Sequence, residues 1–365
     1  MSKAERAGAI LEIDLAAVVA NWRLLCAMHP SGPVAGVVKA DGYGLGALPV
    51  AQALYAAGCR HFFVALLDEA IAIRAAAPEA MVAVLGGLIP GSERDYLGYD
   101  VVPVLGSLAE IELWSAIGRA VDRRLPAILH VDTGMSRLGL DPRQLTVLQQ
   151  DHARLSGLEI SYVMTHLVSS EIRDDPLNEL QLQRFDKACA GLPSAARSML
   201  NSSGMFLGPH FAFDLARPGA ALYGINPTPR ADKNPMTLAV RLIARVVAVR
   251  EIGKCETVGY NATWQAPGRR RIATAAIGYA DGLHRSLSNR GRAFFDGNPV
   301  PLVGRVSMDL TTFDVTAVPG VLPGAWLEII GPGQTPDDLA AAAGTNGYEI
   351  LTSLGARFHR IYRSA

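Results

Sequence analysis

The chain has 365 residues, a length that accommodates two domains, each with a core of its own. Lysine plus arginine and aspartate plus glutamate both number 34, so the formal net charge of +0 argues against nucleic acid or an anionic membrane as the main partner. Hydrophobic residues make up 50% and charged residues 19%, which is typical of a well-packed globular protein and excludes a disordered chain. The expected partner is therefore a small molecule.

The cysteines and the N-terminus indicate a reducing compartment. Cys26, Cys59, Cys189 and Cys255 lie far apart without paired spacing, so the sequence suggests neither a zinc site nor a disulfide framework. The first residues lack the apolar core and cleavage signature of a signal peptide, and no apolar run approaches the ~20 residues of a membrane span. We expect a cytoplasmic protein that binds no metal and contacts no membrane.

From its start the chain alternates between strand and helix signals. Ala9 to Ile13 are predicted to form a strand, and Asp14 is predicted to cap a helix that runs to Met28. Eight further strand candidates follow with helical stretches between them, and eight such units favour a closed barrel of parallel strands over an open sheet. The predicted strands are Val34–Val38, Phe62–Leu66, Met81–Leu85, Val101–Leu105, Ala127–Val131, Ile160–Thr165, Ser198–Asn201 and Asp214–Gly219, and the predicted helices are Ala47–Ala57, Asp68–Ala76, Ser107–Ile117, Pro142–Ala153 and Pro176–Ala190.

The composition of the sequence changes near Pro227. The proline-rich polar stretch NPTPRADKNP there predicts a linker. We predict an α/β protein in which residues 1–230 form a TIM-type (β/α)8 barrel and residues 231–365 a β-dominated C-terminal domain. The first strand, within residues 1–13, is placed to pack with that second domain. The second domain is predicted to contain strands Thr237–Val249, Arg271–Ile277, Val300–Val306, Leu310–Val315 and Trp326–Ile330, and helices Pro336–Ala343 and Asn346–Ser353.

The stretch PVAGVVKADGYGLGA, residues 33–47, points to a reactive lysine. Its apolar run ends at Lys39, and glycines at 42, 44 and 46 then break the strand pattern, so Lys39 stands at the C-terminal end of a strand. Apolar flanks disfavour the charged amine and lower its pKa, which suits an amine that attacks a carbonyl to form a Schiff base. The glycines fit neither phosphate-loop motif, because their spacing differs and the lysine precedes them.

The segment VVKADGYGLGA resembles the cofactor-lysine segment of the alanine racemases, which are pyridoxal phosphate enzymes built on a (β/α)8 barrel. Five further segments match that family in order along nearly the whole chain: HVDTGMSRLGL, YVMTHLVSSE, NSSGMF, LARPGAALYG and VGYNATWQA, with IGYADGLHRSLSNRG and VGRVSMD completing the match. The resemblance implies that the chain interconverts L-alanine and D-alanine through an external aldimine of pyridoxal 5'-phosphate. The product would supply peptidoglycan synthesis, or D-alanine would be catabolised.

The resemblance also implies roles for residues of the barrel. Lys39 would hold the cofactor and act as a base, and Arg137 would reach the phenolic oxygen of the cofactor and the substrate carboxylate. Arg217 would face the pyridine nitrogen. Because arginine keeps its proton, that nitrogen could only accept a hydrogen bond, and the poorer electron sink would favour racemisation over transamination. The remaining implied cofactor contacts are Tyr43, His166, Ser202 and the amides of Gly219 and Ala220.

The second domain would supply the second base. By resemblance Tyr260 works on the L-face of the substrate and Lys39 on the D-face, and His166 lies between Tyr260 and Arg217 to stabilise the phenolate of a residue with a pKa near ~10. Tyr279 would line the substrate entrance, and the amide of Met308, held by the Asp309 loop, would bind the substrate carboxylate. In the family a head-to-tail homodimer brings Tyr260, Tyr279 and Met308 to the partner's barrel.

Two positions depart from the family pattern. His130 stands where the family has a lysine, often carbamylated, that pairs with the arginine matched by Arg137. We expect either a small anion such as chloride or a nearby acid such as Asp132 to balance Arg137 instead. The family often has a tyrosine near the C-terminus that touches the phosphate, and an ungapped alignment places Ala356 there.

Three alternatives stay open on the sequence alone. A racemase of broader specificity, acting on serine or lysine, would use the same machinery. A non-catalytic pyridoxal phosphate carrier shares the lysine segment but consists of a single barrel. A barrel decarboxylase would release CO2.

Overall fold

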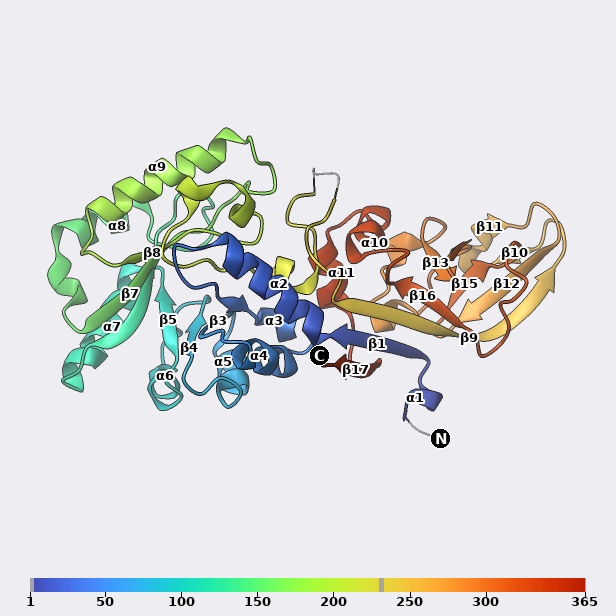
Figure 1. Cartoon of the computed structure of the whole chain (residues 1–365), viewed down its shortest axis with the longest axis horizontal. Coiled ribbons are helices and arrows are strands. Elements are labelled where there is room, and N and C mark those ends of the chain that lie inside the picture. The colour runs from blue at the N-terminus through green and yellow to red at the C-terminus, as the bar shows by residue number, and fades with distance from the viewer. Residues whose placement is uncertain (1–2, 230–232, 365) are drawn as a thin grey trace.

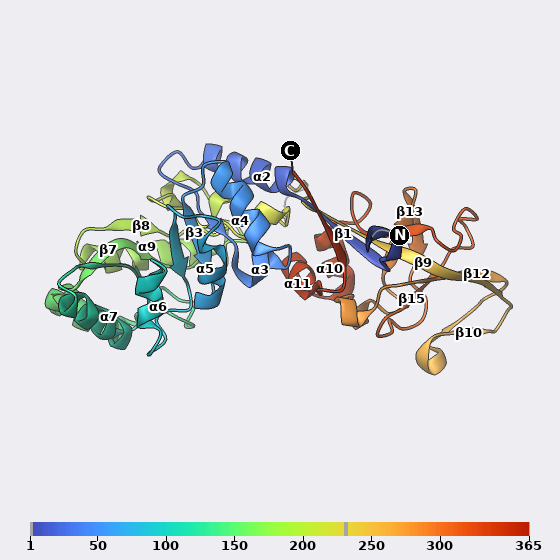
Figure 2. The ribbon, with the colours of Figure 1, turned by 90° about the horizontal axis from the view of Figure 1, so that it is seen from below.

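The computed structural model describes residues 3–229 and 233–364. Figure 1 shows two lobes along the longest axis, with a barrel of strands and helices at one end and a sheet-rich lobe at the other. The view from below shows the same two lobes joined by long strands near the middle (Figure 2). The chain therefore folds into two lobes.

In the part of the chain that the structure describes, seven strands form one parallel sheet in the order of the sequence, β2 to β8. Parallel strands in sequence order require a crossover after each strand, and the helices between them provide it. The strands are β2 Gly36–Val37, β3 His61–Val64, β4 Met81–Val84, β5 Val102–Leu105, β6 Leu125–His130, β7 Leu158–Met164 and β8 Ala196–Ser198. The α-helices of this lobe are α2 Leu15–Met28, α3 Lys39–Tyr43, α4 Ala47–Ala56, α5 Leu67–Arg74, α6 Glu93–Gly98, α7 Leu108–Ala120, α8 Pro142–Gln150 and α9 Pro176–Ala190.

Residues 214–218 close this sheet into a barrel without forming a regular strand. On one side the Arg217 amide donates to the Leu200 carbonyl (2.9 Å), and on the other the Ala216 amide donates to the Pro33 carbonyl (3.1 Å). Ala216 makes only an isolated bridge to Val34, because Pro218 carries no amide hydrogen to continue the ladder. The predicted strand over residues 214–219 is therefore an extended, hydrogen-bonded segment.

The chain begins and ends in the sheet of the second lobe. Strand β1, Ala9–Asp14, lies between β9 and β17, parallel to the latter and antiparallel to the former. Asp14 then caps α2, accepting a hydrogen bond from the Ala17 amide at 2.9 Å, so the sequence turns directly from this sheet into the barrel. The two lobes are consequently connected twice, at Asp14 and by the chain that leads from the barrel to β9.

The second sheet is predominantly antiparallel and is built around β9, which pairs with β1, β12 and β16. All five predicted strands and both predicted helices have counterparts, whereas β13, β17 and the hairpin of β10 and β11 have none in the sequence prediction. The strands are β9 Val240–Ile252, β10 Thr257–Val258, β11 Trp264–Gln265, β12 Arg270–Ala275, β13 Arg292–Phe295, β14 Asn298–Pro301, β15 Thr311–Asp314, β16 Trp326–Ile330 and β17 His359–Arg363, with helices α10 Pro336–Ala343 and α11 Gly347–Ser353, and a short α1 at Lys3–Arg6.

A small apolar cluster fills the inside of the barrel. Its members point inward from successive strands, while a larger cluster lies between the strands and the surrounding helices and continues into the second lobe. The inner cluster gives the barrel a packed floor, as expected when inward side chains stack in layers. Its buried members are Ala35, Val37, Phe63, Ala83, Val102, Val104, Ile128, Met164 and Leu215.

Candidate active site

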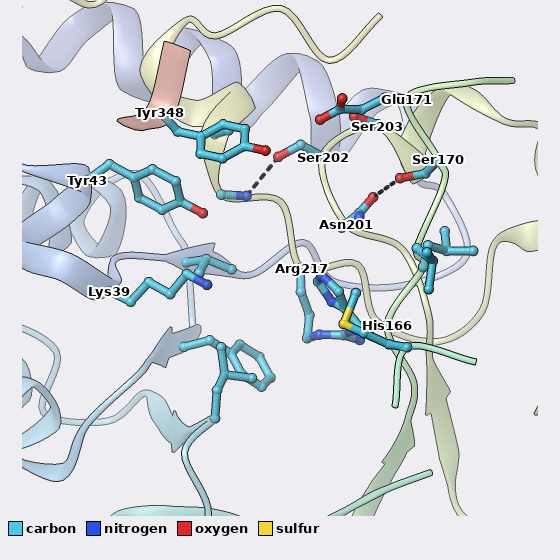
Figure 3. Close-up of a pocket in the computed structure, with 18 of the residues that line it drawn as sticks. Lys39, Tyr43, His166, Ser170, Glu171, Asn201, Ser202, Ser203, Arg217 and Tyr348 are labelled. Atoms are coloured by element: carbon cyan, nitrogen blue, oxygen red, sulfur yellow. Dashed lines mark hydrogen bonds between the residues drawn. The ribbon is translucent and has the colours of Figure 1, made fainter. Parts of the chain in front are cut away.

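A cavity of about 540 Å³ opens above this floor, at the C-terminal ends of the barrel strands. In parallel α/β folds this end of the strands is where chemistry is placed. Figure 3 shows Lys39 and Tyr43 on one side of the cavity and His166 and Arg217 on the other. The structure brings together all the site residues predicted on the barrel: Lys39, Tyr43, Arg137, His166, Ser202, Arg217, Gly219 and Ala220.

Lys39 begins a left-handed turn, where the sequence predicts a glycine-rich loop. Ala40, Asp41 and Tyr43 have φ of +53°, +52° and +56°, and Gly42 continues the turn with φ of +61°. Left-handed backbone costs roughly 1–2 kcal/mol for each non-glycine residue. Strain of this kind persists only where the surrounding structure holds it, and it gathers at functional sites.

The amine of Lys39 is prepared for reaction with a carbonyl. Burial lowers the pKa of Lys39, the positive charge of Arg137 lowers it further, and the carboxylate of Glu69 partly opposes both. This is the direction expected from the apolar flanks in the sequence. A larger share of free amine is thus present near neutral pH than for an exposed lysine.

Arg217 is a buried cation at the other end of the cavity. Its side chain donates to the Thr165 carbonyl at 2.7 Å and to the Ser198 hydroxyl, which in turn donates to the Leu215 carbonyl at 2.6 Å. Burial lowers the pKa of Arg217 to about 9, and no acidic group among the described residues offsets it. The guanidinium stays charged at neutral pH, held in place by neutral acceptors.

Two histidines near this cation stay neutral. Burial lowers the pKa of His166 to about 3, with further lowering by Arg217, Lys39 and Arg137. The pKa of His130 falls to about 4, again first through burial and then through Arg217. His166 lines the cavity, whereas His130 lies behind it on β6. Neither ring adds positive charge to the site.

Hydroxyl groups and backbone amides converge at the opposite end from Arg217. The Ser202 hydroxyl accepts from the amides of Gly219 (3.0 Å) and Ala221 (3.2 Å). A Cβ atom on Gly219 would lie 2.1 Å from the Tyr43 hydroxyl, so only glycine leaves this space open. The result is a cradle of neutral donors that suits a small anion.

Tyr348 is a cavity residue that the sequence comparison missed. It lies in the first turn of α11, and Figure 3 shows its ring beside Tyr43 with the hydroxyl directed toward Ser202. Ala356, where the ungapped alignment places the family's tyrosine, does not line this cavity, whereas Tyr348 does. The cap of α11 by Asn346 was the available signal, since it fixes which side chains occupy the first turn.

The four site residues predicted on the second lobe do not line this cavity. Tyr260, Tyr279 and Met308 are 68%, 44% and 53% exposed. The backbones of the last two lie side by side, because the Tyr279 amide donates to the Ser307 carbonyl at 3.0 Å. Asp309 accepts from Arg357 at 2.7 Å on the same surface.

The chain matches two family models over nearly its whole length. Residues 13–227 match the alanine racemase N-terminal domain, and residues 239–362 match the alanine racemase C-terminal domain. The chain belongs to the alanine racemase family. This membership excludes the single-barrel carrier, and the family's reaction, the interconversion of L-alanine and D-alanine with pyridoxal phosphate, is the activity of this chain.

Named relatives and a solved structure agree with this membership. An alanine racemase of Acidiphilium cryptum is 53% identical and covers 97% of this chain and 98% of its own length. A catabolic alanine racemase of Mesorhizobium japonicum is 48% identical, covering 98% and 93%. The crystal structure of alanine racemase from Bartonella henselae with covalently bound pyridoxal phosphate has a TM-score of 0.95 and 40% identity, over 98% of this chain and 100% of that one.

The chemistry of the cavity fits pyridoxal phosphate. The Lys39 amine suits the carbonyl of that cofactor, and the cradle at Ser202 and Gly219 suits its phosphate. The neutral acceptors around Arg217 leave a guanidinium proton able to face a ring nitrogen. A side chain at position 219 would fill the cradle, so the open space is part of the site.

No described helix is long and apolar enough to cross a membrane. Residues 3–229 and 233–364 contain no group of histidine, cysteine, aspartate and glutamate side chains placed to hold a metal ion.

Proposed function

We propose that this racemase works with two bases, Lys39 of the barrel and Tyr260 of a partner's second lobe. One observation carries the proposal: the cavity joins the lysine, the anion cradle and a buried arginine, whereas Tyr260, the second base that the resemblance implies, is exposed on the other lobe and does not line it. Racemisation requires a proton to leave one face of the substrate and to arrive on the other. The chain supplies the first of these groups within the cavity and carries the second on a distant surface.

The bound cofactor supplies a conjugated ring that accepts electron density from the substrate Cα. Lys39 moves a proton at its Nζ atom on the D-face. Arg217 would donate toward the ring nitrogen and, since it stays charged, would keep a proton off that nitrogen. Ser202, Tyr43 and the amides of Gly219 and Ala220 would hold the phosphate, and we add Tyr348 to this group.

On the substrate side, Arg137 lines the cavity and is exposed, so its guanidinium can bind a carboxylate in a bidentate manner. Tyr260 would move the proton at its phenolic oxygen on the L-face. His166 supports that role as a neutral hydrogen-bonding ring between the phenol and Arg217. Tyr279 and the Met308 amide complete the entrance and the carboxylate site.

The second base would come from a homodimer. An apolar rim of Leu66, Ile89, Leu138 and Val168 follows four of the barrel strands around the cavity, and these side chains are 58%, 63%, 49% and 43% exposed. A second copy fits this rim, because the second lobe presents exposed apolar groups of its own: Tyr260, Tyr279, Met308 and Leu310. A two-fold dimer would then contain two equivalent composite sites.

Mixing two inactive variants tests this arrangement. Lys39→Ala and Tyr260→Phe chains, refolded together in equal amounts, would form half mixed dimers, each with one intact site, so activity returns to roughly a quarter of wild type. Sites built within single chains would leave the mixture inactive.

The control pairs Lys39→Ala with Arg217→Met. Both substitutions lie on the barrel, so every composite site in a mixed dimer carries one of them and no activity should return. Recovery in this control would show that mixing itself restores activity and would remove support for shared sites.

The range of substrates stays a prediction, as does the cytoplasmic location. An enzyme specific for alanine is expected, and a racemase that also acts on serine or lysine is the alternative. Racemisation rates with L-alanine, L-serine and L-lysine distinguish the two, since a broad enzyme would turn over all three at similar kcat/KM.

A further inference from the structure

The left-handed turn that follows Lys39 is held at both of its ends by charged side chains. Residues 40–44 all have positive φ, and they separate Lys39 from the glycine-rich entry into α4. A strained segment relaxes unless its neighbours restrain it. Each end of the turn therefore needs a partner, and the structure provides one from each lobe.

Glu69 of α5 restrains the start of the turn. One of its carboxylate oxygens accepts from the Ala40 amide at 2.6 Å, directly after Lys39. The other oxygen accepts from the amides of Ala65 (2.8 Å) and Leu66 (3.1 Å), which follow strand β3. A single side chain thus ties the turn to the end of the neighbouring strand through charge-assisted hydrogen bonds.

Arg360 of β17 restrains the end of the turn. Its guanidinium donates to the Gly44 carbonyl at 2.7 Å, across the boundary between the lobes. The approach is close, since a Cβ atom on Gly44 would lie 2.2 Å from the Leu351 carbonyl oxygen of α11. The second lobe therefore packs directly against the segment that carries Lys39 and Tyr43.

We propose that Glu69 and Arg360 are positioning residues that hold the left-handed turn in place, so that Lys39 and Tyr43 keep their places on the cavity wall. The inference rests on the proposed role of Lys39 as the cofactor lysine. It adds that the second lobe acts on the cavity of its own chain through Arg360, besides serving the partner. Neither side chain lines the cavity, so each holds the turn through its backbone, and Glu69 also acts on Lys39 through its charge.

The test for Glu69 compares Glu69→Gln with Asp68→Asn in the full-length chain. Each substitution removes one negative charge from the first turn of α5. Asp68 is exposed and precedes Glu69, the residue that accepts the hydrogen bond from the left-handed turn. We expect Glu69→Gln to speed hydrogen exchange of amides 40–46 by roughly ten- to a hundredfold, the effect of losing a charge-assisted hydrogen bond, with Asp68→Asn unchanged.

A second readout follows the reaction of Lys39 itself. The chain is freed of pyridoxal phosphate, and the rate at which the cofactor is captured is measured against pH by visible absorbance. The charged and titratable groups facing Lys39 are Arg137, Glu69 and His166. Because the Glu69 carboxylate raises the pKa of Lys39, Glu69→Gln should move the midpoint of this profile to lower pH, whereas Asp68→Asn should not.

The test for Arg360 uses Arg360→Met with Arg363→Met as its control on the same strand. Arg363 binds Glu12 on the surface and makes no contact with the turn in the structure. We expect Arg360→Met to speed hydrogen exchange of amides 40–46 and to slow cofactor capture about tenfold. Arg360→Lys should restore part of both effects, because lysine can still donate to the Gly44 carbonyl.

The outcomes separate the two proposals. Wild-type protein that captures no cofactor at Lys39 would contradict the proposed function. Normal capture by wild type, with unchanged exchange and capture in both Glu69→Gln and Arg360→Met, would overturn the role of these two residues. Should Glu69→Gln fail to fold, an unchanged Arg360→Met is sufficient to overturn the two-ended restraint.

Discussion

At the scale of single residues, the cavity sorts its basic groups by charge. Arg217 stays protonated although burial lowers its pKa to about 9, whereas His166 is neutral because burial and the surrounding cations lower its pKa to about 3. A fixed cation beside a neutral hydrogen-bonding ring suits a proton-transfer site. The neutral His166 ring lowers the stability of the folded protein at acidic pH, and this loss can be measured.

We predict that His166→Gln makes the protein less sensitive to acid. The pKa of His166 is depressed from 6.5 to about 3 in the folded state, so below pH 6.5 the unfolded chain binds a proton that the folded chain does not. The free energy of unfolding of the wild-type protein is therefore not reduced by His166 above pH 6.5. It decreases as the pH falls toward 3, and the decrease is about 2 kcal/mol at pH 5. Urea unfolding at pH 7 and pH 5 measures this decrease in stability. The control is His152→Gln at an exposed position, which should lose as much stability as the wild type. Equal decreases in the wild type and both variants would contradict the prediction.

We predict that activity depends on chloride and not on CO2. None of the ion pairs among residues 3–229 and 233–364 includes Arg137. Asp132, the acid expected as an alternative, already accepts from the amides of Gly134, Met135 and Ser136. Removing CO2 should leave kcat and KM unchanged, whereas replacing chloride by a bulkier anion should raise KM. A KM independent of the anion would leave the acid as the partner.

At the scale of elements, helix α11 connects the second lobe to the cavity. Its N-cap Asn346 accepts from the Glu349 amide at 2.9 Å, which orients the first turn and with it Tyr348. Sequence pattern alone predicts this helix, because asparagine is a strong signal for the start of a helix. Which of its side chains enters the cavity depends on how α11 packs against the turn at residues 40–44.

We predict that Asn346→Ala weakens both stability and cofactor binding. Loss of an N-cap costs roughly 0.5–2 kcal/mol. The loosened first turn should also release Tyr348 from the phosphate cradle, which raises the Kd of pyridoxal phosphate. The control is Asp141→Ala, which removes the cap of α8 from the amides of Arg143 and Gln144, away from the cavity. Equal cofactor affinity in the two variants would count against this role of α11.

At the scale of the whole molecule, one chain builds the cavity, whereas Tyr260, the second base that we propose, is exposed on the other lobe of that chain. We predict that Ile89→Lys on the apolar rim shifts the protein toward monomers and lowers kcat, because a charge there opposes docking of the second lobe. Val121→Lys, an equally apolar and 49% exposed position at the end of α7, is the matched control. Sedimentation velocity measures the change; an active monomeric Ile89→Lys enzyme would contradict the composite site.

The sequence by itself determined the alternation of strands and helices, the change of composition near residue 227 and the lysine at the end of a strand. These features depend on local spacing and composition. The sequence also predicted the helix cap at Asp14, which acts over three residues, and the helix that Asn346 proves to cap. Only the tertiary structure decided the rest. The closing segment at residues 214–218, the left-handed turn after Lys39 and the entry of Tyr348 into the cavity all depend on contacts between segments far apart in the chain, and such contacts leave no periodic signal in one sequence.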